Sequence, residues 1–304
     1  MCMALSSAKD KNGKFYDVIG VEIDSEIGKK KVSDINQGII PINSCDDNIS
    51  KKFKEALSRG NFKASTSDNC FSDADIIIID INLDVNDLEN KANINFKNFK
   101  NAIRTIGKKM PKDCLVIVET TVPPGTTEEI VYPLLLNTLK ERFPDILRIN
   151  LAHSYERVMP GENYIKSITD YWRVYAGIDK KSSLLCKKFL ETFINIYDYP
   201  LTQLSTPRSS ETAKIIENSY RAANIAFINE WGLFAEAIGI DIFEIIEAIK
   251  LRPTHNNIMR PGLGVGGYCL TKDPIMGSIS ASQIYHNNSL KFPISLHSME
   301  INRL

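Results

Sequence analysis

The sequence predicts an α/β fold: a doubly wound parallel sheet that lacks its first strand, followed by an all-helical region with one long helix. Short apolar runs alternate with helical segments through the first 200 residues, which is typical of parallel strands joined by crossover helices. After Tyr199-Pro200 the apolar positions recur at helical spacing instead. We therefore expect two domains, 1–200 and 201–304.

Five apolar runs are the predicted strands of the first domain, because strands buried on both faces are almost continuously apolar. The last run overlaps the aromatic sequence 171–175, which could equally be a core-packing cluster. The expected helices between the strands cover 26–37, 49–59 and 96–108. The strands themselves are predicted at 16–24, 75–81, 114–119, 148–152 and 172–176.

One long helix is predicted in the second domain. Residues 210–238 contain no proline and a single glycine, and Gly239 offers a stop. A second helix is expected at 242–250, before Pro253, and another after Asp273. The second domain is therefore expected to be helical.

Residues 1–8 resemble the helix that follows the glycine turn of a dinucleotide-binding, Rossmann-like sheet. Such a sheet normally begins with a strand, a GxGxxG turn and a helix, and carries an acid at the end of its second strand about 20 residues later. Asp24 or Glu22 supplies that acid, but nothing upstream matches the first strand or the turn. We expect the chain to begin inside its first βαβ unit and to end abruptly at 300–304.

Composition excludes several classes of function. Lysine plus arginine number 37, and so do aspartate plus glutamate, so no net field favours nucleic acid or an anionic membrane. No apolar run is long enough to span a bilayer, and no signal peptide is visible. The six cysteines form neither a CxxC pair nor a cluster with histidine, so no metal site or disulfide framework is indicated. We expect a cytoplasmic protein.

The most informative segment is 261–273, which places four glycines within six positions ahead of Cys269. Glycine permits backbone torsions that are closed to other residues and lets a ligand approach the main chain. A cysteine becomes a nucleophile when positive charge or backbone amides favour its thiolate, and Lys272 and Asp273 follow closely. The alternative is a glycine-rich surface turn beside a buried structural cysteine.

Thr121 follows the strand predicted at 114–119, where open α/β sheets bind their ligands. The alternative for this segment is turn chemistry with a helix N-cap from Thr126 or Thr127.

Glu156 follows the strand predicted at 148–152, and a carboxylate there could orient a water or act as a base. An ion pair with Arg157 on a solvated loop is an equal alternative. His153 is expected to be a hydrogen-bonded structural residue.

On the long helix, Lys214 and Asn218 share a face with Arg221, Ile225 and Asn229. An ammonium and an amide one turn apart could stabilise an oxyanion. The alternative is a solvent-exposed helix face.

Taken in this order, the segments resemble the UDP-glucose/GDP-mannose dehydrogenase family of nucleotide-sugar dehydrogenases. Their motif sequences resemble the UDP-N-acetylhexosamine branch of that family more than the UDP-glucose branch. The resemblance covers nearly the whole chain, and the last motif is highly specific. The residues that carry it are 21–24 with 35–38 and Pro41, 121–125, 156–161, Lys214 with Asn218, Asn224 and 229–230, and 264–273.

The resemblance implies two NAD-linked oxidations of a UDP-sugar 6-hydroxyl to a carboxylate, without metal. Cys269 would capture the intermediate aldehyde as a thiohemiacetal, and a thioester would follow. Glu156 would assist the hydrolytic water, Lys214 and Asn218 would stabilise the oxyanion, and Asp273 would manage protons near the thiol.

The same resemblance implies the binding residues. Asp24 would hold the adenosine ribose of NAD and Thr121 would lie near the nicotinamide, with Glu156 and Lys272 also on the cofactor side. The expected contacts of the substrate are Arg157, Lys214, Asn218, Gly264, Gly266 and Gly267. A homodimer through the long helix 210–238 is the expected assembly.

Three departures from the family pattern lead us to expect weak or absent activity. The pyrophosphate-binding glycine turn is missing, residues 80–83 replace a proline-rich stretch, and the C-terminal nucleotide-gripping domain does not follow. Two other functions stay open: a two-electron β-hydroxyacid-type NAD dehydrogenase, and a non-catalytic dimerising fragment.

Overall fold

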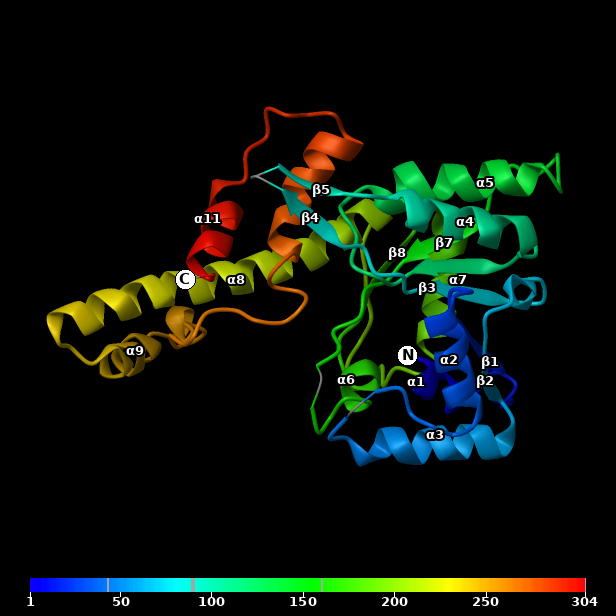
Figure 1. The fold of residues 1–304 in the computed structure, drawn as a ribbon, viewed down its shortest axis with the longest axis horizontal. Coiled ribbons are helices and arrows are strands. Elements are labelled where there is room, and N and C mark those ends of the chain that lie inside the picture. Colours follow the sequence, from blue (N-terminus) through cyan, green and yellow to red (C-terminus); the bar gives the residue numbers. More distant parts are fainter. Residues whose placement is uncertain (43, 89–90, 160, 304) are drawn as a thin grey trace. The chain divides into compact units, whose positions relative to one another are not determined.

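The computed structural model describes residues 1–42, 44–88, 91–159 and 161–303 (Figure 1). Pro160 of the predicted motif 156–161 and Leu304 lie outside these residues. The chain forms two compact units that interleave along the sequence. Unit 1 is Met1–Ile81, Lys97–Thr120 and Thr127–Ser210, and unit 2 is Asn82–Phe96, Thr121–Thr126 and Glu211–Leu304.

Unit 1 contains two pieces of sheet. In the first, β1 (Val18–Val21) pairs in parallel with β2 (Phe62–Ser65). The second has the order β3-β6-β7-β8-β9. Its strands are β3 (Ile76–Ile79), β6 (Leu115–Val118), β7 (Asn150–His153), β8 (Val174–Gly177) and β9 (Thr202–Gln203). All five predicted strands are present, which confirms the predicted fold class.

One pairing departs from the prediction of a parallel sheet, because β8 runs antiparallel to β7. The other pairs of the larger sheet, β3 with β6, β6 with β7 and β8 with β9, are parallel. The described residues between β7 and β8 contain only the four-residue helix α6 (Lys166–Thr169) and no long crossover helix. The aromatic alternative for 171–175 is not a core cluster, since the Trp172 ring lies 5.0 Å from the Tyr199 ring between centroids but is 48% exposed.

Helices cover both faces of the larger sheet (Figure 1). On one face α1 (Cys2–Ser6) and α7 (Lys180–Leu190) share a core cluster with Ile117 and Tyr175. On the other face lie α4 (Lys97–Lys109) and α5 (Tyr132–Lys140), which pack on each other. Helices α2 (Glu26–Asn36) and α3 (Asp47–Arg59) pack near β2. The sheet is therefore doubly wound, as predicted.

Unit 2 is built on α8 (Pro207–Ile238), whose first turn still belongs to unit 1. The predicted helix 242–250 is α9 (Ile242–Lys250). Short turns at η3 (Pro253–His255), η4 (Asp273–Ile275), α10 (Met276–Ile279) and η5 (Ser280–Ile284) lead to α11 (Pro293–Ile301). An unpredicted antiparallel hairpin, β4 (Val85–Leu88) with β5 (Lys91–Ile94), completes the unit. No helix among the described residues is long and apolar enough to cross a membrane.

Candidate functional site

The glycine-rich segment 261–273 has the backbone that its glycines permit. Gly264 and Gly267 adopt φ of +86° and +83°, a region that residues with a side chain rarely enter. At Gly264 a Cβ atom would lie 2.7 Å from the carbonyl oxygen of Asn302. That carbonyl also accepts a hydrogen bond from the Val265 N–H at 3.2 Å. Glycine is thus required at position 264 both by the positive φ and by the lack of room for a Cβ atom.

Cys269 is exposed at the end of this segment, so the alternative of a buried structural cysteine is wrong. Its carbonyl accepts hydrogen bonds from the N–H groups of Lys272 at 3.1 Å and Asp273 at 2.9 Å. The Thr271 hydroxyl donates to the Gly267 carbonyl at 2.7 Å. The turn is therefore fixed by its own short-range hydrogen bonds, and Cys269 is exposed in it.

A charged network is formed by the two residues Lys272 and Asp273, whose N–H groups bond to the Cys269 carbonyl. The Lys272 ammonium is 3.0 Å from Asp273 Oδ1, and their side chains are 11% and 0% exposed. The ammonium also lies 4.5 Å from the centroid of the Tyr268 ring. Asp273 Oδ2 accepts a hydrogen bond from the Asn218 amide at 2.6 Å. Because each carboxylate oxygen has a donor, the buried charge of Asp273 is compensated.

The polar face of α8 packs against this segment. Asn218 reaches Asp273, and three turns further on the Asn229 side chain accepts a hydrogen bond from the Gly262 N–H at 3.0 Å. Lys214 is only 7% exposed. The alternative of a solvent-exposed face is therefore wrong for Lys214 and Asn218, although Arg221 is exposed.

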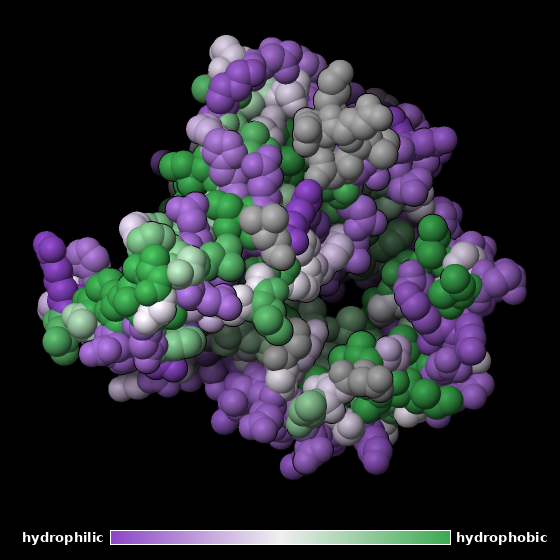
Figure 2. All heavy atoms as spheres, turned by 60° about the vertical axis from the view of Figure 1, so that its left-hand side comes forward, coloured by the Kyte–Doolittle hydropathy of each residue, from purple (hydrophilic) through white to green (hydrophobic). Residues whose placement is uncertain are grey.

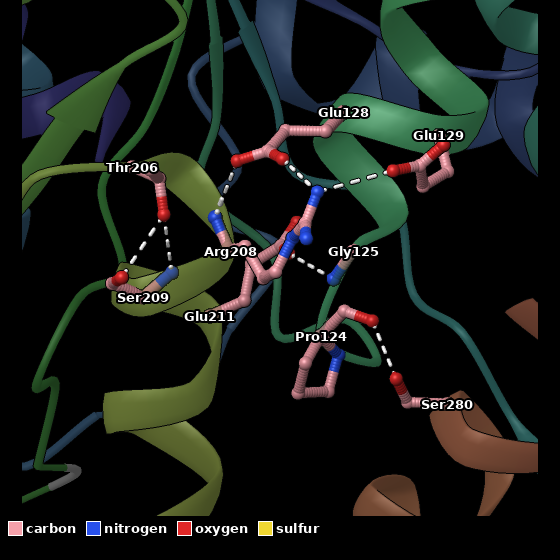
Figure 3. A network of polar contacts seen from close by, with 9 residues as sticks. All are labelled: Pro124, Gly125, Glu128, Glu129, Thr206, Arg208, Ser209, Glu211 and Ser280. Atoms are coloured by element: carbon pink, nitrogen blue, oxygen red, sulfur yellow. Dashed lines mark hydrogen bonds and ion pairs between the residues drawn. The ribbon is translucent and has the colours of Figure 1, made fainter. Parts of the chain in front are cut away.

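The loop after β6, which carries Thr121, is held from α8 and η5 (Figure 3). The Gly125 N–H donates to Glu211 Oε2 at 2.5 Å, and the Ser280 hydroxyl donates to the Pro124 carbonyl at 2.5 Å. Glu211 is buried, with 1% of its surface exposed. The sequence pattern did not single out Glu211 or Ser280, because both act across long sequence separations.

Gly125 itself is restricted by its surroundings. Its φ is +95°, and a Cβ there would lie 2.3 Å from the Tyr285 hydroxyl oxygen. Thr126 does not act as the predicted N-cap, since its hydroxyl donates back to the Pro123 carbonyl at 2.6 Å. It closes the turn instead, which confirms the turn chemistry of that alternative for Thr126.

The beginning of α8 is capped and paired within unit 1 (Figure 3). The Thr206 hydroxyl accepts a hydrogen bond from the Ser209 N–H at 3.1 Å, as an N-cap does. Arg208 pairs with Glu128 and, at 3.1 Å, with Glu129. These contacts fix the helix start from which Lys214 and Asn218 extend.

A buried ion pair lies at the carboxyl edge of the sheet. Arg173 is 2.7 Å from Glu119, and their side chains are 3% and 4% exposed. Burial raises the pKa of the Glu119 carboxyl, and the charges of Arg173 and the N-terminal ammonium oppose that rise. Glu119 Oε2 and Arg173 Nη1 have no hydrogen-bond partner among the described residues. The sequence indicates this pair only by a single charged residue beside an apolar run, Glu119 after β6 and Arg173 before β8.

The predicted motif after β7 is partly structural. His153 is fully buried and its Nδ1 lies 2.8 Å from the Ser210 hydroxyl, which confirms its structural role. Arg157 donates to the Trp172 carbonyl at 2.6 Å and to the Tyr155 hydroxyl at 3.2 Å. Glu156 accepts a hydrogen bond from the Val158 N–H. The catalytic role of Glu156 and the substrate contact of Arg157 stay predictions.

Asp24 lies between β1 and the N-cap of α2, where a dinucleotide-binding fold places its ribose-binding acid. Its side chain is 66% exposed and forms a surface ion pair with Lys29 at 3.3 Å. An exposed carboxylate can accept hydrogen bonds from ribose hydroxyls, so the residues present fit this part of NAD.

The predicted site residues divide between the two units. Asp24, Glu156 and Arg157 belong to unit 1. Within unit 2, Asn218, Lys272 and Asp273 are joined by the contacts described above. The other predicted residues of unit 2 are Thr121, Lys214, Gly264, Gly266, Gly267 and Cys269.

Comparison with protein families gives two matches. Residues 5–199 match the NAD binding domain of the UDP-glucose/GDP-mannose dehydrogenase family, and residues 208–303 match its central domain. These matches confirm the resemblance expected from the motifs and NAD as the cofactor of that domain family.

Individual relatives agree. A UDP-N-acetyl-D-mannosamine dehydrogenase of Methanocaldococcus jannaschii is 33% identical over 259 residues, which cover 85% of this chain and 55% of the relative. One from Campylobacter jejuni is 31% identical over 84% of this chain and 60% of its own length. A UDP-D-ManNAc dehydrogenase structure from Pyrococcus horikoshii matches with a TM-score of 0.78 and 30% identity, over 99% of this chain and 64% of that one. The chain thus spans little more than half the length of the curated relatives.

Proposed function

Because the chain belongs to the UDP-glucose/GDP-mannose dehydrogenase family, we propose that its residues serve the oxidation of a UDP-linked N-acetylhexosamine at the 6-hydroxyl. The product would be the 6-carboxylate. Relatives named for UDP-N-acetyl-D-mannosamine support this substrate class.

The observation that carries the proposal is the exposed Cys269, which ends a glycine-rich segment and whose carbonyl bonds to the N–H groups of the charge-compensated Lys272 and Asp273. Neither two-electron oxidation of an alcohol nor simple binding requires a thiol. An aldehyde that must be oxidised further does benefit from covalent capture. An exposed cysteine two residues after the glycine pair 266–267 could leave room for a sugar C6.

Cys269 would act in the second half of the reaction. Its thiolate adds to the C6 aldehyde carbon, a C–S bond forms, and the carbonyl electron pair moves to oxygen. Loss of hydride from C6 leaves a thioester. Addition of water to the thioester then releases the carboxylate and returns the thiol, so one water is consumed for each sugar.

The overall balance is one water consumed and two hydrides lost for each C6 alcohol converted to a carboxylate. NAD, when bound, supplies the hydride acceptor for both oxidations. Side chains of this chain would hold the substrate and the adduct and would transfer the protons.

The polar residues around the thiol would hold the adduct. An amide nitrogen carries two N–H donors, so Asn218 can donate one to Asp273 and keep the other for the oxyanion. Lys214, one turn earlier on the same buried face of α8, would add positive charge. Asp273 would fix the Asn218 amide and handle protons near the sulfur, and Lys272 would balance its charge.

The remaining roles would fall to two residues of unit 1 and to Thr121 of unit 2. Asp24 would hold the adenosine ribose of NAD, and Glu156 would take a proton from the hydrolytic water. Thr121, although it belongs to unit 2, follows β6 directly and would line the nicotinamide side. These assignments rest on the family resemblance at the matching positions.

The test is a count of reduced cofactor. The purified chain is incubated with UDP-N-acetyl-D-mannosamine and NAD, and NADH is measured per sugar consumed. Turnover is expected to be slow at most, but each sugar that is consumed should give two NADH, and Cys269→Ser should abolish the carboxylate product. Cys45→Ser is the matched control, because Cys45 is also an exposed cysteine. One NADH per sugar, with no effect of Cys269→Ser, would support the two-electron dehydrogenase instead.

We further propose that the chain forms a homodimer through α8. Phe227, Trp231, Phe234 and Ile238 recur at steps of four, three and four, and they are 54%, 47%, 49% and 54% exposed. Figure 2, in which the α9 end of the molecule is turned forward, shows apolar side chains at the surface. A contiguous apolar stripe of this kind marks an interaction surface.

The dimer is tested by light scattering during size-exclusion chromatography. We expect twice the chain mass for the unaltered protein and the monomer mass for Trp231→Glu. Tyr197→Glu is the control, since Tyr197 is 94% exposed and lies away from α8 in the sequence. A monomer mass for the unaltered chain at all concentrations would contradict the assembly.

A further inference from the structure

A tyrosine side chain joins the segment that carries the thiol to the hairpin of unit 2. The Tyr268 hydroxyl donates a hydrogen bond to Asp84 Oδ1 at 2.8 Å. Asp84 directly follows residues 80–83, where the chain departs from the proline-rich stretch of its family, and Tyr268 directly precedes Cys269. The bond therefore connects two parts of unit 2 that lie 184 residues apart in the sequence.

Asp84 has a fixed position at the base of the hairpin. Its neighbour Leu83 is buried, with 3% of its surface exposed. At the same end of the hairpin Val85 pairs with Ile94. The Ile94 N–H donates to Gln283 Oε1 at 3.0 Å, and Ile94 is 3% exposed. The Asp84 carboxylate is thus held on an anchored element and not on a free loop.

The hairpin is bonded to both ends of one stretch of chain, residues 268–284. Tyr268 begins this stretch and Gln283 lies near its end, and Cys269, η4, α10 and η5 lie between them. Helix α10 packs on β5, and its Ile279 is only 1% exposed. Because the same hairpin holds both ends of the stretch, it restricts the movement of the residues between them.

The ring of Tyr268 is held from two directions. Asp84 bonds its hydroxyl, and the Lys272 ammonium lies 4.5 Å from its ring centroid. Burial raises the pKa of the Tyr268 phenol, and the hydrogen bond to Asp84 raises it further. The phenol therefore stays protonated and remains a donor. A hydrogen bond to a carboxylate is also stronger than one to a neutral acceptor.

We propose that Asp84 is a positioning residue for Cys269, and that it acts by fixing the turn of the thiol through Tyr268. The inference rests on the proposed function for the role of the thiol, whereas the anchoring is a property of the fold alone. A thiolate must approach an aldehyde carbon within a narrow range of distance and angle, and misplacement by about 1 Å can cost about a hundredfold in rate. The anchor should therefore affect the chemical step more than the affinity for the sugar.

The first measurement is backbone amide exchange, followed by NMR in the purified chain. The N–H groups of Lys272 and Asp273 donate to the Cys269 carbonyl, so their exchange reports the order of that turn. In Tyr268→Phe, which keeps the ring, and in Asp84→Ala, both amides should exchange faster by at least about tenfold. The double variant should exchange no faster than either single variant, because all three lack the same bond.

Three controls separate the hydrogen bond from other effects. Asp84→Asn keeps an acceptor oxygen, so it should restore exchange to within about twofold of the unaltered chain. The Gly262 N–H bonds to the Asn229 side chain elsewhere in unit 2, and its exchange should not change. Tyr220→Phe removes the hydroxyl of another exposed tyrosine of unit 2, one that accepts its bond from Asn257, and should leave the turn unaffected.

The second measurement is turnover of UDP-N-acetyl-D-mannosamine with NAD. Tyr268→Phe and Asp84→Ala should lower kcat by at least about tenfold and leave KM within about twofold, and Asp84→Asn should restore kcat. If the unaltered chain gives no NADH, the proposed function fails, and amide exchange alone decides whether Asp84 anchors the turn.

Four results would overturn the inference. Unchanged exchange at Lys272 and Asp273 in Tyr268→Phe would mean that the bond does not hold the turn. Faster exchange at Gly262 as well would mean general loosening of unit 2. Additive effects of the two single variants would mean that they act separately. A raised KM at unchanged kcat would mean that Asp84 serves sugar binding and not the position of the thiol.

Discussion

Replacing Gly125 by alanine should destabilise unit 2 for two separate reasons. The φ of +95° places an alanine in the left-handed region, which costs about 1–2 kcal/mol. The new Cβ would also lie 2.3 Å from the Tyr285 hydroxyl oxygen and 2.8 Å from its Cζ. Overpacking of that kind costs about 1–3 kcal/mol. We expect a total loss of about 2–5 kcal/mol in unfolding free energy.

Gly239→Ala is the matched control. Gly239 belongs to the same unit, has φ of +74°, and has no atom within 4 Å of the Cβ position. It should show the torsional cost alone, about 1–2 kcal/mol. Both substitutions restrict the unfolded chain equally, so that contribution cancels in the comparison.

The assay is denaturant unfolding followed by tryptophan fluorescence. The chain has two tryptophans, Trp172 and Trp231, so Trp172→Phe leaves a reporter in unit 2 alone. Placing Gly125→Ala in a Tyr285→Ala background removes the clashing ring, and the cost of the glycine replacement should then fall to that of Gly239→Ala. Equal costs for the two glycine replacements in the unaltered background would refute the reasoning.

Two further predictions concern buried charge and buried thiols. Arg173→Met leaves the buried Glu119 carboxylate without its partner and should cost about 3–5 kcal/mol of unfolding free energy. Adding Glu119→Leu should restore most of that free energy. Equal costs for the single and the double variant in denaturant titrations would contradict this prediction. Burial raises the pKa of the Cys114 and Cys186 thiols to about 12 from 9.0. The folded chain therefore holds these protons more tightly, so their stabilisation is complete below pH 9.0 and is lost as the pH rises toward about 12. Replacing both cysteines by alanine should flatten the fall in unfolding free energy above pH 9.0, and an unchanged slope would count against buried thiols as its source.

The strands and the long helix were predictable because their signals are local. Four consecutive isoleucines define β3, and thirty-two residues without an internal break define α8. The thiol was predictable because glycines and Cys269 are neighbours in the sequence. Glu211 and Tyr285 were not, since they fix Gly125 from sequence separations that no local pattern records.

The antiparallel course of β8 was missed for a related reason. Its apolar residues would suit either direction, because direction depends on the connection and not on the strand itself. The Glu119–Arg173 pair was missed as well, because one charge beside an apolar run gives no sign of its partner.

The interleaving of the two units has a consequence for how the chain matures. The polypeptide passes between the units five times, at 81/82, 96/97, 120/121, 126/127 and 210/211. The Ile94 N–H of β5 donates a hydrogen bond to Gln283 Oε1, and Gln283 leaves the ribosome almost two hundred residues later. Co-translational folding therefore cannot finish unit 2 until nearly the whole chain has emerged, and an isolated fragment cut at a single point would lack part of one unit.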